Sequence, residues 1–335
     1  MYTLLRKILF LLNAEFAHNL GLNGLKLLEK FGLIWLIAKK LPTKQVDIMG
    51  ICFPNAVGLA AGMDKNGDYI DCLGALGFGF LELGTVTPRP QSGNPKPRLF
   101  RIKPAQAIIN RMGFNNKGVD HLIEKIKQTK YSGIIGVNIG KNFDTPIEKA
   151  VDDYCICFRK AYSVADYIAI NISSPNTKNL RALQSENQLQ ELLNALKLEQ
   201  KKLHKETGRY VPFAVKIAPD LTDDEINSIA LIINANAIDA VIATNTTIER
   251  IAVHDLKYGR ENGGLSGQPL KNQSDNVLKQ LVAALGEKTP VIGVGGIMTG
   301  SDAANKFELG AKLVQIYTGF VYRGPHLINE IINQY

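Results

Sequence analysis

The sequence predicts an α/β fold, a (β/α)8 TIM barrel preceded by a small N-terminal helical extension. Beyond residue 50, short apolar runs rich in β-branched residues alternate with longer segments of helical spacing. There are eight such runs, and eight strands alternating with helices close into a parallel barrel. Each run is followed by polar residues or glycines, at the point where barrels of this class gather their active sites.

The predicted strands take up the apolar runs in chain order: 57–60, 79–83, 134–139, 167–172, 213–217, 240–244, 291–294 and 313–317. The clearest helical segments between them are 186–206 and 223–236. Pro42 and the polar residues 43–45 form a short linker. We therefore expect two units, a helical segment over 1–41 and the barrel over 42–335.

The first unit has the pattern of two short amphipathic helices. Apolar side chains recur at helical spacing in 4–12 and 22–38, with Lys and Arg on the other face. The longest unbroken apolar run, Leu33 to Ala38, is too short to span a bilayer, and no segment fits a signal peptide. Periodicity alone leaves two interpretations open. The helices lie on a membrane with Trp35 as an interfacial anchor, or they bury their apolar face on the barrel.

Charge and cysteine usage exclude some function classes. The net charge is +8, and half of it falls in the first 40 residues, which hold six basic and two acidic side chains. The rest of the chain has no Lys/Arg stripe interleaved with aromatic residues, so we expect no nucleic-acid partner. The four cysteines have no zinc or redox spacing and are expected to be reduced thiols.

The segment after the fourth predicted strand is the most informative in the chain. Residues 171–177 place two amides, Asn171 and Asn176, around the hydroxyl of Ser174, and they contain no His, Cys or carboxylate. Such a loop suits a neutral, hydrogen-bonding ring. Any proton transfer at this loop has to use the serine.

Lys216 lies inside the apolar fifth strand, where an ammonium has to meet an anion or lose its proton. One interpretation places it against the reduced edge of a flavin, where hydride arrival leaves negative charge. A second makes it the Schiff-base lysine of a barrel aldolase. A third is a lysine that extends to solvent from the end of a strand.

Other features of the rim extend this picture. Gly295, Gly296 and Gly319 follow strands seven and eight, where barrels commonly bind phosphate. Asn110 and Asn245 add two amides, so that four asparagines could match the N–H and C=O edge of a pyrimidinedione. The long proline-rich connection 85–110 predicts a segment that covers the substrate at the barrel mouth. No His falls in these motifs and none has metal-ligand spacing, which disfavours a His base and metal catalysis.

Taken together, the motifs resemble those of the quinone-dependent (class 2) dihydroorotate dehydrogenase family, in its bacterial form. They come in the family's order and cover essentially the whole chain. The only departure is conservative, since Met63 stands where Leu is common. The motifs are Leu59–Lys65, Gly84–Pro90, Asn110–Asn115, Asn138–Lys141, Asn171–Thr177, Val215–Asp220, Ala243–Thr247, Gly263–Gly267 and Gly293–Ile297.

The resemblance implies one FMN per chain and a site for dihydroorotate or its product orotate, with no metal. Ser174 would be the catalytic base, removing the C5 proton while the C6 hydride moves to flavin N5. The expected FMN ligands are Ala61, Gly62, Met63, Asp64, Lys65, Thr85, Asn138, Asn171, Lys216, Thr244, Gly267, Gly296, Tyr317 and Thr318. The expected substrate ligands are Lys65, Asn110, Arg111, Met112, Gly113, Phe114, Asn171, Asn176, Asn245 and Thr246.

The resemblance also implies partners and a place in the cell. The family oxidises (S)-dihydroorotate to orotate in de novo pyrimidine (UMP) biosynthesis and passes electrons to a membrane quinone, ubiquinone or menaquinone. Class 1 relatives use a cysteine base, so Ser174 favours class 2. Residues 1–41 would line the quinone tunnel and contact the membrane. We therefore expect a monomer bound peripherally to the cytoplasmic face of the cell membrane.

Overall fold

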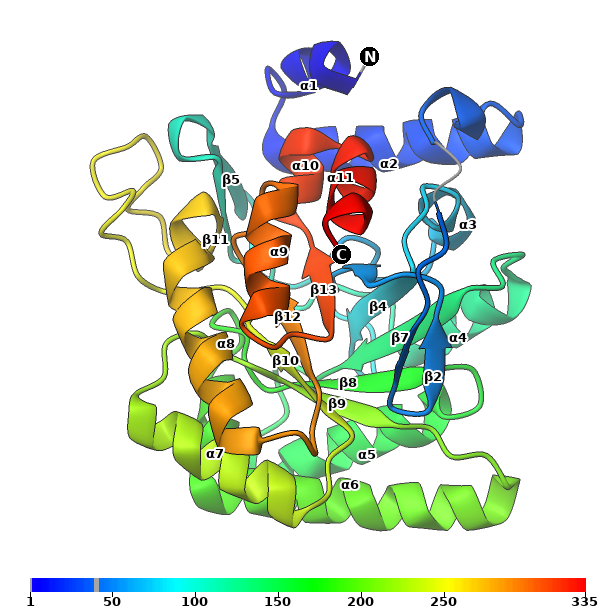
Figure 1. The fold of residues 1–335 in the computed structure, drawn as a ribbon, viewed down its shortest axis with the longest axis vertical. Coiled ribbons are helices and arrows are strands. Elements are labelled where there is room, and N and C mark those ends of the chain that lie inside the picture. The colour runs from blue at the N-terminus through cyan, green and yellow to red at the C-terminus, as the bar shows by residue number, and fades with distance from the viewer. Residues whose placement is uncertain (1, 39–41) are drawn as a thin grey trace.

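In the computed structural model, which describes residues 2–38 and 42–335, eight parallel strands close into a barrel (Figure 1). Going round the barrel, the strand order is β10-β12-β13-β3-β4-β7-β8-β9. The predicted barrel is confirmed, and the expected boundary at residue 41 lies outside the described residues. The strands are β3 (Val57–Leu59), β4 (Phe80–Val86), β7 (Ile134–Ile139), β8 (Tyr167–Asn171), β9 (Phe213–Ile217), β10 (Ala240–Ala243), β12 (Val291–Val294) and β13 (Leu313–Ile316).

The helices pack on the outside of this barrel (Figure 1). The segment predicted at 223–236 is helix α7, which begins with a capping box between Thr222 and Glu225. The segment predicted at 186–206 is α6, which ends where Gly208 takes a positive φ of 70°. The helices of the barrel are α3 (Ile70–Gly74), α4 (Val119–Gln128), α5 (Ala150–Ala161), α6 (Glu186–Thr207), α7 (Asp223–Ala235), α8 (Lys271–Leu285), α9 (Gly300–Glu308), α10 (Thr318–Arg323) and α11 (His326–Gln334), with 3-10 turns η3 (Ile147–Lys149), η4 (Leu180–Gln184) and η5 (Gln268–Leu270).

The amino end of the barrel interior is apolar and tightly filled. The ring of Phe80 occupies the space beside Gly58, where an added Cβ would lie 2.2 Å from the ring. A hairpin of β1 (Val46–Ile48) and β2 (Ile51–Phe53) covers this end, and Val46 and Phe53 belong to the same buried cluster as Phe80. The cavity described below therefore opens only toward the carboxyl ends of the strands.

A three-stranded antiparallel sheet stands over the carboxyl end. It pairs β5 (Leu99–Ile102) and β11 (Gly264–Gly267) on either side of β6 (Ala107–Asn110), around the turn η2 (Lys103–Ala105). The expectation of a proline-rich cover over 85–110 did not include strands β5 and β6, which lie within that connection. Side chains from all three strands line the cavity, so this sheet forms one of its walls.

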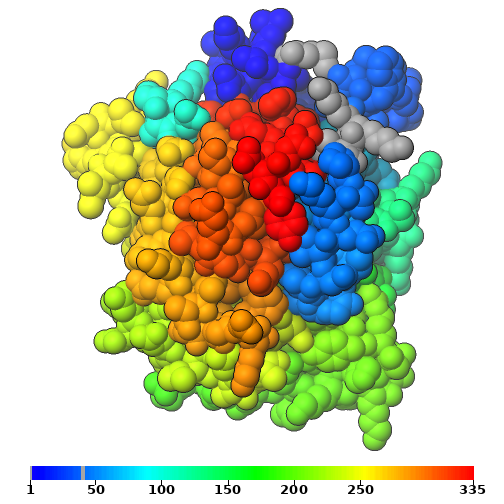
Figure 2. All heavy atoms as spheres, viewed as in Figure 1, coloured from blue at the N-terminus to red at the C-terminus, as the bar shows by residue number. Residues whose placement is uncertain are grey.

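The N-terminal helices are α1 (Tyr2–Leu9) and α2 (Ala14–Lys30), followed by the 3-10 turn η1 (Ile34–Leu36). Helix α2 begins eight residues before the predicted segment, because the Asn13 side chain caps it by accepting from the backbone N–H groups of Glu15 (3.0 Å) and Phe16 (3.2 Å). It ends just before Gly32, whose φ is 68°. Figures 1 and 2 show these residues as a separate layer at one end of the molecule.

This layer is fastened to the barrel mainly by polar contacts. The guanidinium of Arg98 donates to the Glu15 carboxylate at 2.8 Å, and the Tyr2 hydroxyl donates to the carbonyl of Val321 at 2.7 Å. Only Ala17 and Leu22 of α2 are buried. Among the described residues, eleven of the nineteen exposed large apolar side chains lie between residues 4 and 36, with Trp35 68% exposed. The apolar face is therefore largely not buried on the barrel.

No helix among the described residues is long and apolar enough to cross a membrane.

Candidate active site

A single cavity at the carboxyl end of the barrel collects most of the side chains that the sequence singled out. Loops after the barrel strands form its floor and sides, and the β5–β6–β11 sheet forms a wall. Of the expected FMN ligands, it is lined by Ala61, Gly62, Lys65, Thr85, Asn171, Lys216, Thr244, Gly267, Gly296, Tyr317 and Thr318. Of the expected substrate and catalytic residues, it is lined by Lys65, Asn110, Met112, Gly113, Phe114, Asn171, Ser174, Asn176, Asn245 and Thr246.

Four expected ligands, Met63, Asp64, Asn138 and Arg111, do not line the cavity. The Asp64 carboxylate instead accepts from the backbone N–H groups of three following residues, the closest being Tyr69 at 2.8 Å, and so closes the turn before α3. Burial raises the pKa of Asp64. The Arg111 guanidinium pairs with Glu261 at 2.6 Å and lies over the ring of Phe100.

The amides at the strand ends hold one another in fixed orientations. The Thr85 hydroxyl donates to Asn138 Oδ1 at 2.5 Å and accepts from Asn171 Nδ2 at 2.9 Å. Asn171 Oδ1 in turn accepts from Asn245 Nδ2 at 3.3 Å. Asn138 is fully buried behind the other three and supports them. A chain of this kind, in which each member is satisfied, presents its free edges to a ligand without reorganising.

Lys216 meets a carboxylate of its own chain, Glu82, at 3.3 Å. The Glu82 side chain is fully buried and accepts from four donors. Oε1 accepts from Lys216 Nζ and from Asn138 Nδ2 (2.8 Å), and Oε2 accepts from the Tyr167 hydroxyl (2.9 Å) and from Gln315 Nε2 (2.6 Å). The sequence left open whether this lysine meets an anion or loses its proton, and it did not predict Glu82 as its partner within the chain.

Ser174 lies in the loop between β8 and η4. The residue is 6% exposed, and its Oγ accepts from the backbone N–H of Asn176 at 3.2 Å. The Asn176 side chain donates to Asn110 Oδ1 at 3.1 Å and so ties this loop to β6. No ionisable side chain hydrogen bonds to the Ser174 hydroxyl among the described residues.

Lys65 stands beside this loop with its Nζ donating to the carbonyl of Gly62 at 2.9 Å. Burial, and to a lesser extent the positive charge of Arg98, lowers the pKa of Lys65 to about 8. The Glu15 and Asp64 carboxylates act in the opposite direction.

The opposite end of the cavity is formed by glycines. Gly296 has a φ of 72°, and a Cβ there would lie 2.3 Å from the Cα of Lys271. A Cβ on Gly319 would lie 2.1 Å from the carbonyl oxygen of Ile297. Only glycine fits at either position, and the absence of side chains leaves backbone N–H groups open to an anion.

Residues 43–335 match the protein-family model of dihydroorotate dehydrogenase. The chain belongs to the dihydroorotate dehydrogenase family. Two curated relatives are both dihydroorotate dehydrogenases (quinone). The one from Aeromonas hydrophila subsp. hydrophila is 57% identical over 332 residues, 99% of each chain. The one from Cellvibrio japonicus is 57% identical over 328 residues, 98% of this chain and 96% of the relative.

Solved structures of the dihydroorotate dehydrogenase family agree with the fold. The enzyme from Eimeria tenella in complex with ferulenol superposes with a TM-score of 0.87 at 38% identity, over 96% of this chain and 90% of the other. Its ligand-free form gives a TM-score of 0.86 at 38% identity, over 94% of this chain and 93% of the other. The chain is therefore an oxidoreductase of this family with the barrel that the sequence predicts.

In this dihydroorotate dehydrogenase cavity and in the loop that carries Ser174, the structure also shows features that sequence reasoning missed. Thr177 Oγ1 and Gln315 Oε1 are buried and have no hydrogen-bond partner among the described residues. Gln315 could have been singled out as an amide inside an apolar strand, as Lys216 was. Thr177 gave no comparable signal, because a threonine in a turn is ordinary. Apolar lining residues such as Leu99 and Met298 could not be foreseen from spacing.

Proposed function

We propose that this protein is a quinone-dependent dihydroorotate dehydrogenase with FMN as its resident cofactor, oxidising (S)-dihydroorotate to orotate in de novo pyrimidine biosynthesis. One observation carries the proposal. Four asparagines and one buried serine converge on a cavity whose other end is a glycine cradle. The printed activity of the curated relatives supports the same substrate and a quinone acceptor.

The residues present fit FMN. Gly296 and Gly319 line this end of the cavity and suit the phosphate, since backbone without side chains lets N–H groups approach an anion. Lys216 lines the cavity and can hold negative charge on the ring edge, while Glu82 beneath it holds the ammonium in place. Gln315 Oε1 is a buried acceptor with no donor from the described residues, which a ring N–H can satisfy. When bound, FMN supplies the acceptor for the C6 hydride.

The substrate end is arranged for a neutral ring that carries a carboxylate. Asn110, Asn171, Asn176 and Asn245 each offer a donor and an acceptor to the ring edge. Lys65 at the same end supplies a positive charge for the carboxylate. These residues fix the ring so that its C5 side faces Ser174.

Ser174 is the base that takes the proton from C5. Because a serine hydroxyl is a weak base, its own proton has to pass on as the C–H bond breaks. Thr177 lies three residues further along the same loop, and its hydroxyl is buried with no partner among the described residues. Its hydroxyl can receive that proton while passing its own on to water, so the relay needs no carboxylate or histidine.

The aldolase interpretation of Lys216 is weakened by the ion pair with Glu82. A lysine nucleophile is commonly activated by desolvation in apolar surroundings or by a neighbouring cation. Lys216 instead has the Glu82 carboxylate at 3.3 Å, and no cation is among its partners in the described part of the chain.

The N-terminal helices are proposed to contact the membrane and to admit the quinone. Their exposed apolar side chains, Trp35 included, suit a lipid surface better than water. Residues 1–41 carry the excess of basic charge that attracts anionic headgroups. We accordingly assign the protein to the cytoplasmic face of the cell membrane as a peripheral monomer, with residues 42–335 as the FMN-binding catalytic unit.

The test is the colour of the purified protein. A flavoprotein is yellow and bleaches when dihydroorotate is added without oxygen. A colourless protein that borohydride traps on a carbonyl substrate through Lys216 would instead establish the aldolase.

A further inference from the structure

An ion pair just outside the cavity joins three of the loops that form the active site. Arg181, on η4, pairs with Asp220, which follows β9, at 2.7 Å. Neither side chain lines the cavity. We propose that Arg181 is a positioning residue that holds the base Ser174 in register with the substrate-binding loop after β10. The proposal rests on the function proposed above.

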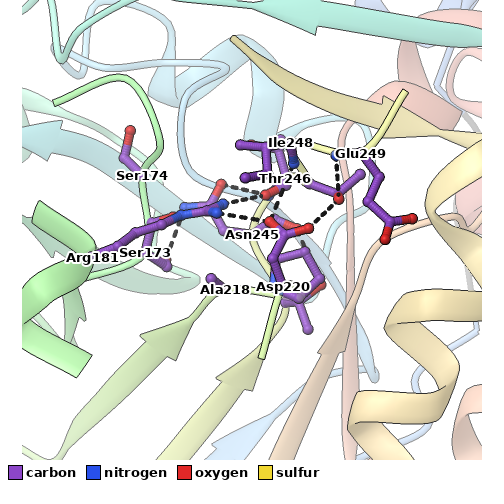
Figure 3. Close-up of polar contacts among 12 residues, drawn as sticks. Ser173, Ser174, Arg181, Ala218, Asp220, Asn245, Thr246, Ile248 and Glu249 are labelled. Atoms are coloured by element: carbon purple, nitrogen blue, oxygen red, sulfur yellow. Dashed lines mark hydrogen bonds and ion pairs between the residues drawn. The ribbon is translucent and has the colours of Figure 1, made fainter. Parts of the chain in front are cut away.

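The contacts of Arg181 carry this inference. Its Nε donates to the carbonyl of Ser173 at 3.0 Å, Nη1 donates to Asp220 Oδ2 at 2.7 Å, and Nη2 donates to the carbonyl of Thr246 at 2.8 Å. Figure 3 shows the guanidinium between these partners, with the Ser174 hydroxyl directed away from the network. One planar group therefore holds the backbone beside Ser174 and the backbone of the β10 loop at the same time.

Asp220 gives the guanidinium a fixed partner. Its Oδ1 accepts from the Thr247 hydroxyl and from Gln273 Nε2 (3.1 Å), and its Oδ2 accepts from the backbone N–H of Ile248 at 3.2 Å. Gln273 lies on α8, so the carboxylate is held from the barrel wall as well as from the β10 loop. Asp220 cannot move without breaking several hydrogen bonds, and Arg181 is held through it.

The effect reaches the base through one peptide unit. The carbonyl oxygen of Ser173 lies in the same peptide plane as the nitrogen and Cα of Ser174. Fixing that oxygen therefore also fixes the Cα from which the Ser174 side chain extends. The carbonyl of Thr246 similarly fixes the loop that carries Asn245. A shift of about 1 Å between a base and its substrate can cost about 10²-fold in rate.

Arginine is required because the three acceptors lie in three directions. A guanidinium offers five N–H donors in a rigid plane, whereas a lysine ammonium is a single point on a flexible stem. The two side chains are only 21% and 13% exposed, so water does not readily replace the lost donors. Arg181→Lys is therefore expected to keep the positive charge but not to hold the Ser174 loop and the loop after β10 in their relative positions.

The experiment measures the two half-reactions of the FMN-loaded full-length protein separately. Arg181→Ala is expected to keep its flavin and to be reoxidised by a quinone at the wild-type rate, although its thermal midpoint should fall because Asp220 loses its counter-charge. Its limiting rate of reduction by dihydroorotate is expected to fall by about 10- to 100-fold, with orotate affinity changed less than about threefold. Arg181→Lys should recover only a small part of that rate.

A double-mutant cycle tests whether the effect passes through the base. In a Ser174→Ala background, adding Arg181→Ala should slow reduction by less than about threefold, because there is no base left to misplace. The matched control is Arg159→Ala, which removes a bidentate pair with Glu199 on the outer helices α5 and α6. It should leave reduction at the wild-type rate.

Several outcomes would overturn the proposal. These are reduction of the Arg181→Ala protein at the wild-type rate, an equal loss with and without Ser174, or the same loss in the Arg159→Ala control. If Arg181→Ala does not retain flavin, the cycle is run with Arg181→Lys and read in the same way. A wild-type protein that dihydroorotate fails to reduce would refute the proposed function, a result distinct from each of these.

Discussion

The buried pair of Lys216 and Glu82 makes the sharpest prediction about stability. Lys216→Met removes the ammonium and leaves a carboxylate that is 0% exposed and 3.3 Å from where its counter-charge stood. The three neutral donors from Asn138, Tyr167 and Gln315 remain, but none carries a compensating charge. Breaking a buried pair from one side costs about 3–5 kcal/mol, which is about 10²- to 10⁴-fold in the folding equilibrium.

The assay is urea unfolding of the flavin-free protein, so that loss of flavin binding does not contribute. With a slope of about 3 kcal/mol per M, the midpoint of Lys216→Met should drop by about 1 to 2 M. The double variant Glu82→Gln/Lys216→Met removes both charges and should recover at least half of that loss. The control is Lys160→Met, since the exposed pair of Lys160 with Asp120 should contribute less than about 1 kcal/mol.

Two results would refute this reasoning. A Lys216→Met protein within about 1 kcal/mol of wild type would show that Glu82 is not an uncompensated buried charge. A double variant no more stable than the single one would show that the loss comes from packing around the lysine stem and not from charge.

Three further predictions concern activity and binding. Ser174→Ala should keep flavin and bind orotate, yet slow flavin reduction by about 10²- to 10⁴-fold. Ser174→Cys should be less impaired. A reduction rate near that of the wild type in a rapid-mixing experiment would exclude Ser174 as the base. A protein lacking residues 1–41 should still be reduced by dihydroorotate but turn over long-tailed quinone poorly and no longer sediment with anionic vesicles. Unchanged quinone turnover in the shortened protein would contradict the proposed role of residues 1–41. Binding of the full-length protein to anionic vesicles should weaken as the salt concentration rises. Because the pKa of Lys65 is about 8, the ammonium is present below that pH and lost above it. Orotate affinity should therefore fall as pH rises through about 8, and Lys65→Met should bind weakly at every pH; a flat wild-type profile contradicts the assignment.

The barrel could be predicted from the sequence because the pattern of a strand followed by a helix repeats along the chain. Buried parallel strands are short apolar runs, and eight of them spaced by helical segments leave few alternatives. The hairpin at 46–53 and the sheet of β5, β6 and β11 lack such a signal, since polar residues such as Asp47, Arg101 and Ser266 interrupt their apolar runs. The start of helix α2 was predicted too far along the chain for a related reason. Its start is set by the Asn13 side chain, and a polar cap is not visible in apolar periodicity.

The sequence predicted which residues form the site but not how those residues are arranged around the cavity. A motif contains both the groups that face a ligand and those that hold them, and spacing does not separate the two. Asp64 and Asn138 lie in the predicted motifs, yet Asp64 closes a turn and Asn138 supports the amides from behind. The pairing of Lys216 with Glu82 joins strands 134 residues apart. Only the closed barrel brings them together, because alternate residues of every strand point into the same interior.

The N-terminal unit and the substrate end of the cavity are linked by charge as well as by contact. Arg98 is 7% exposed and is held by Glu15 of α2, and both groups act on Lys65 inside the cavity. Arg98 lowers the pKa of Lys65, and Glu15 raises it. While α2 is docked, the two effects partly cancel at the residue that meets the substrate carboxylate. If α2 moves away from the barrel, Glu15 leaves with it, and the Arg98 charge then acts on Lys65 without its counter-ion. On the proposed function, the docking of α2 is thus linked to the affinity for an anionic substrate through the charges of Glu15, Arg98 and Lys65.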